Sequence, residues 1–191
     1  MDHDPAKKSL WGVKAIGMGE LVFVLGGARS GKSRFAEELA SKSQRGVIYI
    51  ATAQAFDAEM ADRIDRHRAQ RPVDWRTVDA PLELPAALAS ARRSGAFVLV
   101  GCLTHWLSNT MLAERDVDAA CAELISVLSE GDGDIACVSN EVGLSIVPDN
   151  PLGRRFRDAQ GRLNQQVAAV ADRVVFVAAG LPLQLKPAPA P

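Results

Sequence analysis

The chain has 191 residues, of which 48% are hydrophobic and 24% are charged. This composition is that of a globular domain with a sizeable core, and it excludes a low-complexity chain. The formal net charge of -1 leaves no basic excess to neutralise a phosphate backbone, so we expect a small-molecule substrate and no nucleic acid. The chain has no apolar run near 18 residues and no signal-peptide pattern at its start. We therefore expect a cytoplasmic protein with no membrane span.

Three regions differ in character. Residues 1–19 are polar, mixed in charge and without periodicity, and we expect a disordered extension there. Residues 20–186 alternate between apolar runs and amphipathic stretches, which predicts a single domain. Residues 187–191 read PAPAP and predict a mobile tail.

A phosphate-binding motif opens the domain. Residues 21–40 read LVFVLGGARSGKSRFAEELA, in which Gly26, Gly31, Lys32 and Ser33 satisfy GxxxxGK[ST] between an apolar strand and an amphipathic helix. We expect the two glycines to adopt positive φ so that successive amides point at phosphate oxygens, which the helix N-terminus also attracts. Lys32 would contact the β and γ phosphates, and the Ser33 hydroxyl would bind Mg²⁺.

The next helix is expected at 58–69, with Asp57 as its N-cap. His67 follows Ile64 by three residues and Met60 by seven, which places it on the inward face near the helix end. A lone histidine there is usually a packing residue. However, Arg63, Arg66, Arg68 and Arg71 surround it with positive charge that suits a phosphate and favours neutral imidazole. The alternative is a solvated basic helix end.

The remaining elements continue the alternation. Asn140 and Glu141 follow an apolar run, where a parallel sheet binds ligands, so Glu141 is a candidate metal or substrate contact or else a solvated loop acid. His105 is expected to pack or face water, and Cys102, Cys121 and Cys137 to be buried thiols. The predicted fold is a single α/β domain of the P-loop NTPase-like class, with a mostly parallel sheet and helices on both faces. Its strands are expected at 21–25, 46–52, 75–78, 97–102, 134–139 and 174–178, and its later helices at 82–93, 104–113, 117–130 and 151–170.

The 151–170 helix has two distinct faces. Asn150 is a plausible N-cap and Pro151 the first helical residue. An apolar stripe predicts the core face, and it consists of Leu152, Phe156, Ala159, Leu163, Val167 and Val170. The other face carries arginines that would meet phosphates, a neighbouring subunit or only solvent, namely Arg154, Arg155, Arg157 and Arg162.

Several segments together carry a family resemblance. They are GGARSGKSRFAEELA, RIDRHRAQRPVDWRTV, CLTHWLSN, SNEVG and RFRDAQGRLNQ, within a match over about residues 21–186. The chain resembles the bifunctional adenosylcobinamide kinase and adenosylcobinamide-phosphate guanylyltransferase family of cobalamin biosynthesis. The resemblance implies ATP, GTP and Mg²⁺ as cofactors, an adenosylcobinamide substrate, and a homo-oligomer, a trimer in the family.

The resemblance also implies site residues. His67, by its place in RIDRHRAQRP, corresponds to the histidine that is guanylylated, with Lys32 stabilising the leaving pyrophosphate. The chain departs from the family at two acidic contacts, because Asp79 stands where Glu is usual and Gly101 where Asp or Glu is usual. The implied guanine-nucleotide contacts are Gly26, Gly27, Ala28, Arg29, Ser30, Gly31, Lys32, Ser33, Ala51, Thr52, Ala53, Arg68, Ala69, Gln70, Arg71, Asp79 and Gly101.

Gly101 leaves alternatives open. Glycine offers no carboxylate to Mg²⁺, so Ser33 would hold the metal with help from Glu141 or Asp79, and an aspartate introduced at 101 is expected to strengthen metal binding. Two other functions remain compatible with the residues. One is a different small-molecule P-loop kinase, and the other is a non-catalytic GTP-binding protein.

Overall fold

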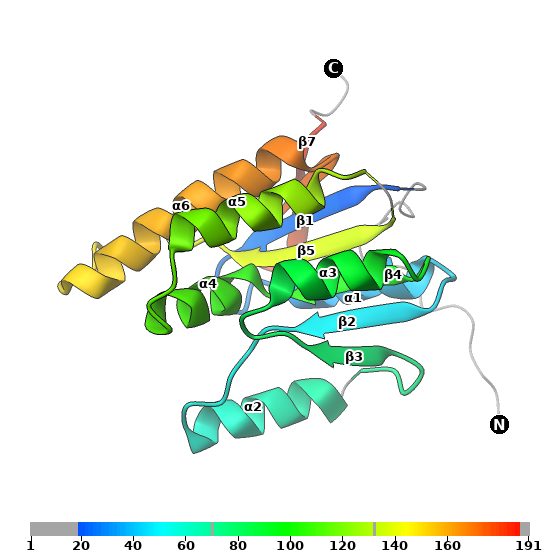
Figure 1. Ribbon diagram of the computed structural model, residues 1–191, viewed down its shortest axis with the longest axis horizontal. Coiled ribbons are helices and arrows are strands. Elements are labelled where there is room, and N and C mark those ends of the chain that lie inside the picture. Colours follow the sequence, from blue (N-terminus) through cyan, green and yellow to red (C-terminus); the bar gives the residue numbers. More distant parts are fainter. Residues whose placement is uncertain (1–18, 70, 132, 188–191) are drawn as a thin grey trace.

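The computed structural model describes residues 19–69, 71–131 and 133–187. The expectations for residues 1–18, Gln70 and 188–191 therefore lie outside the described residues. One seven-stranded sheet runs in the order β3-β2-β4-β5-β1-β6-β7, parallel throughout except between β6 and β7 (Figure 1). The strands are β1 Leu21–Gly26, β2 Val47–Ala51, β3 Arg76–Asp79, β4 Phe97–Gly101, β5 Ile135–Asn140, β6 Arg173–Ala178 and β7 Leu181–Lys186.

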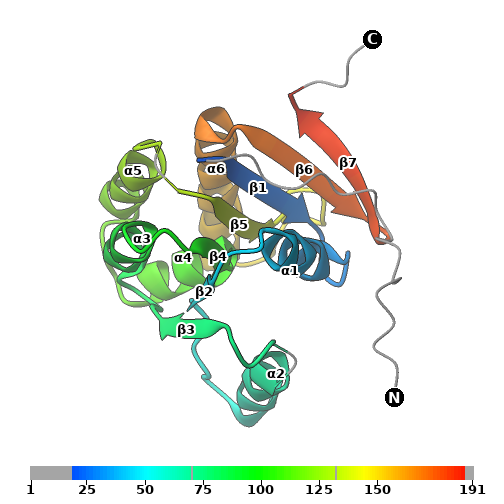
Figure 2. The ribbon, with the colours of Figure 1, turned by 90° about the vertical axis from the view of Figure 1, so that its right-hand side faces the viewer.

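Helices cover both faces of the sheet, which confirms the predicted fold class. Figure 2 shows α1 on one face and α3, α4, α5 and α6 on the other. Among the described residues, no helix has the length and apolar character needed to cross a membrane. The helices are α1 Lys32–Lys42, α2 Ala58–Ala69, α3 Leu84–Arg92, α4 Leu103–Leu112, α5 Val117–Leu128 and α6 Pro151–Val170.

The two faces follow from the alternation of side chains along each strand. In β1, Val22 and Val24 pack with Phe35 of α1, whereas Phe23 points into the opposite cluster, which includes Leu163 of α6. These side chains are all at most 4% exposed. Burial of each such side chain contributes about 1.5–3 kcal/mol, so the central strands are apolar on both faces.

Side-chain caps begin two of the helices where the sequence predicts them. Asp57 Oδ1 accepts a hydrogen bond of 2.7 Å from the Met60 amide, and Asn150 Oδ1 accepts one of 2.7 Å from the Gly153 amide. The expected core stripe of α6 is wrong at its first residue, because Leu152 is 50% exposed. The N-terminal part of α6 extends past the sheet (Figure 1), so that this turn has little to pack against.

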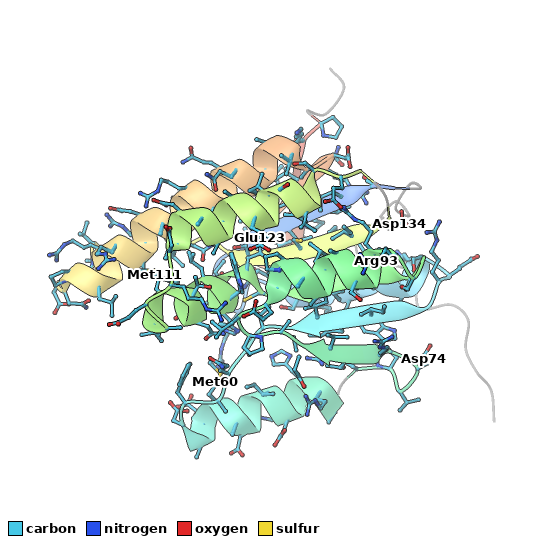
Figure 3. All side chains as sticks on the ribbon, viewed as in Figure 1. Met60, Asp74, Arg93, Met111, Glu123 and Asp134 are labelled. Atoms are coloured by element: carbon cyan, nitrogen blue, oxygen red, sulfur yellow. The ribbon has the colours of Figure 1, made fainter. Side chains whose placement is uncertain are left out.

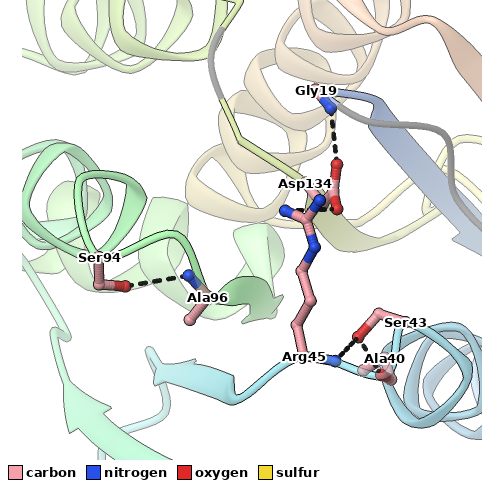
Figure 4. Close-up of polar contacts among 7 residues, drawn as sticks. All are labelled: Gly19, Ala40, Ser43, Arg45, Ser94, Ala96 and Asp134. Atoms are coloured by element: carbon pink, nitrogen blue, oxygen red, sulfur yellow. Dashed lines mark hydrogen bonds and ion pairs between the residues drawn. The ribbon is translucent and has the colours of Figure 1, made fainter.

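A buried carboxylate fastens the amino end of β5 (Figure 4). Asp134 is 3% exposed, and it accepts a 2.7 Å hydrogen bond from the Gly19 amide and forms a 3.1 Å ion pair with Arg45. The three groups lie at the amino edge of the parallel strands. This fastening therefore leaves the opposite, carboxyl edge of the sheet to the ligand site.

Helix α2 lies apart from the layered core, beyond the β3 edge of the sheet (Figures 1 and 2). None of its described side chains is fully buried, and the two expected core residues, Met60 and Ile64, are only half-buried. Met60, labelled in Figure 3, lies on the side of α2 that faces the sheet. Packing therefore holds α2 less firmly than it holds the other helices.

The prediction that the strand at 174–178 would be the last was wrong. β7 pairs antiparallel with β6 after a tight turn at Ala179 and Gly180, which both have positive φ, at 49° and 81°. Ala-Gly is a weaker turn signal than Asn-Gly, and Pro182 argues against a strand in the sheet interior. β7 is an edge strand, where proline is tolerated.

Candidate active site

The phosphate-binding motif forms a tight loop between β1 and α1. Gly31 has φ 98° at the N-cap of α1, as expected. The expectation of positive φ at Gly26 was wrong, since the residue with that conformation is Arg29, at φ 54°. Gly26 is required for another reason: a Cβ there would contact Ser30 Oγ and lie 2.5 Å from the Val177 carbonyl oxygen.

The loop carries polar groups that suit a phosphate. Lys32 is buried, and its Nζ donates a 2.9 Å hydrogen bond to the Gly27 carbonyl. Ser30 Oγ is buried and has no hydrogen-bond partner within the described part of the chain. An orphaned hydroxyl, a buried ammonium group and the N-terminus of α1 fit the oxygens of a nucleotide phosphate.

A cavity of about 440 Å³ lies between this loop and α2. From α2 it takes Glu59, Arg66 and His67, so this helix forms its second wall. Positive charge from both walls attracts a polyphosphate. The loop side consists of Arg29, Ser30, Gly31, Lys32, Ser33 and Arg34.

A second, smaller cavity of about 120 Å³ lies at the carboxyl ends of the strands. Met60 and Ile64 of α2 give it apolar side chains, and Lys32 and Ser33 connect it to the phosphate loop. The cavity therefore has apolar side chains that suit the flat ring of a nucleotide base, and polar side chains at its rim. The strand-end residues that line it are Ala51, Ala53, Asp79, Gly101, Cys102 and Asn140.

His67 lines both cavities. It is exposed, so it is not the packing residue that a lone histidine usually is. Its place near the last turn of α2 puts it beside Arg66 and Arg68. The imidazole therefore stands between the phosphate loop and the strand-end cavity.

The other predicted contacts divide into three groups. Arg71 and Asp79 line the smaller cavity, and Arg68 reaches Asp79 through an exposed ion pair of 3.2 Å. Thr52 lies outside both cavities, where its hydroxyl donates to the Cys102 carbonyl at 2.7 Å. Gly27, Ala28 and Ala69 also lie outside both cavities, and Gln70 is outside the described residues.

Glu141 is not brought into either cavity. Its Oε1 accepts a 2.5 Å hydrogen bond from the Gly143 amide, while its own amide donates to the Gly26 carbonyl at 3.1 Å. The backbone of Glu141 therefore adjoins the phosphate loop, and its carboxylate turns to its own loop. Within the described residues, no group of three acidic, histidine or cysteine side chains gathers as a metal site.

Tyr49 occupies the space beside Gly101. A Cβ at position 101 would overlap the Tyr49 hydroxyl and lie 2.7 Å from Tyr49 Cζ. Arg71 stacks over the ring, with its Cζ 3.5 Å from the ring centroid, and burial raises the Tyr49 pKa to about 12. The absence of a side chain at 101 thus makes room for a half-buried, neutral tyrosine.

Gly101→Asp is expected to destabilise the fold by about 1–3 kcal/mol, because the new side chain overpacks the wall against Tyr49. This replaces the expectation that an acid at 101 would serve Mg²⁺ directly. Chemical denaturation of the single variant and of the Gly101→Asp, Tyr49→Leu double variant measures it. The double variant should recover part of the loss, since the two side chains compete for one space. An unchanged free energy of unfolding in Gly101→Asp would contradict this account.

Sequence reasoning missed several cavity residues. Glu37 follows Ser33 by four residues on α1, and Tyr49 precedes Ala51 by two on β2, so periodicity alone places both beside predicted contacts. Cys102, expected as a buried thiol, and His105, expected to pack or face water, also line the cavity. Burial would raise the Cys102 pKa, but hydrogen bonding and the charge of His105 lower it overall.

Comparison with known proteins identifies the family. Residues 22–185 match the model of the family described as cobinamide kinase / cobinamide phosphate guanyltransferase. The chain is 50% identical over 168 residues to the bifunctional adenosylcobalamin biosynthesis protein CobP of Pseudomonas aeruginosa, covering 87% of this chain and 97% of that one. It is 38% identical over 181 residues to CobU of Escherichia coli, a protein with the same description, covering 87% and 99%.

Solved structures share the fold alone. A prototypical ATPase from a type III secretion system aligns with a TM-score of 0.53 at 14% identity, covering 84% of this chain and 52% of that one. The type III secretion ATPase EscN of enteropathogenic E. coli aligns with a TM-score of 0.55 at 12% identity, covering 86% and 44%. The phosphate loop, the histidine between two cavities and the match over 22–185 agree, and the chain belongs to the cobinamide kinase / cobinamide phosphate guanyltransferase family.

Proposed function

We propose that this protein carries out two successive transfers on adenosylcobinamide. In the first, the substrate hydroxyl attacks the γ-phosphorus of ATP or GTP, and the nucleoside diphosphate leaves. In the second, GMP passes from GTP to the new phosphate ester through His67. The observation that carries this proposal is the position of His67, which lines both the cavity of about 440 Å³ at the phosphate loop and the smaller cavity at the strand ends.

The histidine step divides one displacement into two. A neutral imidazole nitrogen of His67 attacks the α-phosphorus, and a phosphorus–nitrogen bond forms. The bond between the α-phosphorus and the α–β bridging oxygen breaks, and pyrophosphate leaves with its electron pair. A phosphate oxygen of the corrinoid then attacks the same phosphorus and releases the imidazole. Lys32 and the α1 N-terminus stabilise the charge of pyrophosphate, and Arg66 contributes from α2.

Mg²⁺ fits the rim of the same site. The Ser33 hydroxyl would bind it together with phosphate oxygens, and Asp79 is the nearer of the two candidate acids because it lines the smaller cavity. Glu141 would have to release the Gly143 amide first. The ion would supply positive charge to the phosphates, and the protein groups would orient them.

We also propose that the enzyme is a cytoplasmic homo-oligomer, with the trimer of the family as the expected form. Exposed apolar side chains after β5 support self-association. Leu144 and Ile146 are 85% and 92% exposed, and Val147 is 58% exposed. Such side chains commonly mark protein contacts when they are contiguous.

Incubation with α-labelled and γ-labelled GTP tests the function. The α-label is expected to become covalently attached, and the γ-label is not, because pyrophosphate leaves. The bond should be labile in acid and stable in alkali, as a phosphoramidate is. A different P-loop kinase would turn over nucleotide without labelling, and a non-catalytic GTP-binding protein would show neither activity. Failure of the α-label to attach in the presence of Mg²⁺ would contradict the proposal.

A further inference from the structure

Three described carboxylates line the two cavities, and they differ in what they contact. Glu59 is exposed on α2 and lines the cavity at the phosphate loop, and Asp79 is exposed and bound by Arg68 at 3.2 and 3.3 Å. Glu37 is half-buried on α1. Its carboxylate accepts no hydrogen bond from the described residues. Its acceptor capacity is therefore available to a ligand of the smaller cavity.

Glu37 shares a wall of that cavity with Tyr49, Arg71 and Gly101. Arg71 stacks on the Tyr49 ring, and the Tyr49 hydroxyl approaches the Gly101 carbonyl at 3.4 Å. Glu37 therefore belongs to the same stretch of cavity wall as the stacked Tyr49 and Arg71 side chains. Tyr49 fills the space of a side chain at 101, so Glu37 brings negative charge to the wall where Gly101 brings none.

A carboxylate in this position distinguishes purines. Guanine presents two neighbouring donors, N1–H and the 2-amino group, which a carboxylate accepts together. Adenine presents the lone pair of its N1 at the same place, which a carboxylate repels. The half-buried setting strengthens both effects, because it excludes part of the screening water.

We propose that Glu37 is the residue that selects guanine, by accepting hydrogen bonds from N1–H and the 2-amino group of a nucleotide in the smaller cavity. Met60 and Ile64 supply the apolar contact for the ring, and Lys32 and Ser33 lie toward the phosphates. This inference rests on the proposed use of GTP. The contacts that the sequence analysis expected on α1 end at Ser33, so this role for Glu37 is additional to them.

Asp79 is the other carboxylate of the smaller cavity that could bind the guanine base, and its contacts argue against this role. Both of its carboxylate oxygens accept from the same Arg68 nitrogen. The pair is exposed at the cavity rim, with the Arg68 and Asp79 side chains 53% and 67% accessible. A solvated, paired carboxylate discriminates less than a half-buried one whose oxygens are unengaged.

The test compares GTP with ITP, which lacks only the 2-amino group, and with ATP. Dissociation constants are measured on the full chain by competition with a fluorescent GTP analogue. In Glu37→Gln, the affinity for GTP is expected to fall about 10- to 100-fold, the range for hydrogen bonds to a charged group. Discrimination between GTP and ITP should shrink toward unity, while the affinity for ATP is kept or increased.

Glu38→Gln is the matched control, because Glu38 is the next acid on α1 and pairs with Lys42 at 2.9 Å. It should retain the GTP to ITP ratio of the natural chain. A collapse of that ratio in Asp79→Asn but not in Glu37→Gln would overturn the inference, and so would an unchanged ratio in both. Covalent labelling by α-labelled GTP separates the role of Glu37 from the proposed function. If the protein is labelled but the GTP to ITP affinity ratio is the same in Glu37→Gln as in the natural chain, this inference fails and the proposed function stands.

Discussion

His67→Ala is expected to lose guanylyl transfer by at least about 10⁴-fold, since it removes the nucleophile itself. Covalent labelling by α-labelled GTP should disappear in this variant. Phosphorylation of adenosylcobinamide should persist, because the phosphate loop and Lys32 are untouched. The measurement follows label retained on denatured protein beside formation of the phosphate ester in the same sample.

His105→Asn provides the control for the loss of an imidazole. His105 lies on α4 and lines the smaller cavity, where, against the opposing effect of burial, its hydrogen bond and charge lower the pKa of the Cys102 thiol. The variant is expected to keep forming the covalent adduct. If the label survived in His67→Ala and vanished in His105→Asn, the nucleophile would be His105 on α4, and the assignment of His67 would be refuted.

Lys32→Ala is expected to lower both transfers by about 10²- to 10³-fold, because each reaction develops charge on phosphate oxygens that the ammonium group stabilises. The fold is expected to weaken by about 1 kcal/mol, because the variant loses the 2.9 Å hydrogen bond from Lys32 Nζ to the Gly27 carbonyl. A cation in the first turn of α1 also opposes the helix dipole, which offsets part of this loss.

Steady-state rates with saturating Mg²⁺ and thermal unfolding of the same samples test the Lys32 variant. Lys42→Ala, at the last turn of α1 and paired with Glu38, removes an equal charge far from the loop and should leave both rates unchanged. Equal turnover in Lys32→Ala and the natural chain would exclude the loop as the phosphate site.

The fold was largely predictable because its signals are local. The strand expected at 21–25 is β1, Leu21–Gly26, and the helix expected after the glycine turn is α1, Lys32–Lys42. Asn150 caps α6 as its side chain predicts. β7 was missed because Ala179 and Gly180 resemble no strong hairpin turn. Its leucines also alternate toward solvent, with Leu181 70% exposed and Leu183 57% exposed, so it lacks a core-facing pattern.

The site was predictable only where one segment carries it. The phosphate loop is contiguous in the chain, and the strand-end contacts follow from the common edge of parallel strands. The Tyr49 and Gly101 arrangement depends on register, which pairs Ala51 with Gly101 and so brings the tyrosine diagonally beside the glycine. No spacing in the chain shows this complementarity. Glu37 was overlooked because its helix was considered only for its core face.

Because α2 lies at the periphery, activity can be lost while the core of the protein stays folded. This helix holds His67, yet none of its described side chains is fully buried, so its local opening exposes little apolar surface and costs little free energy. Warming should therefore disorder α2 while the sheet persists, and transferase activity should vanish below the temperature at which the core melts. The same loose attachment lets a bound nucleotide draw α2 toward the loop, so that part of the binding energy is spent on ordering the helix.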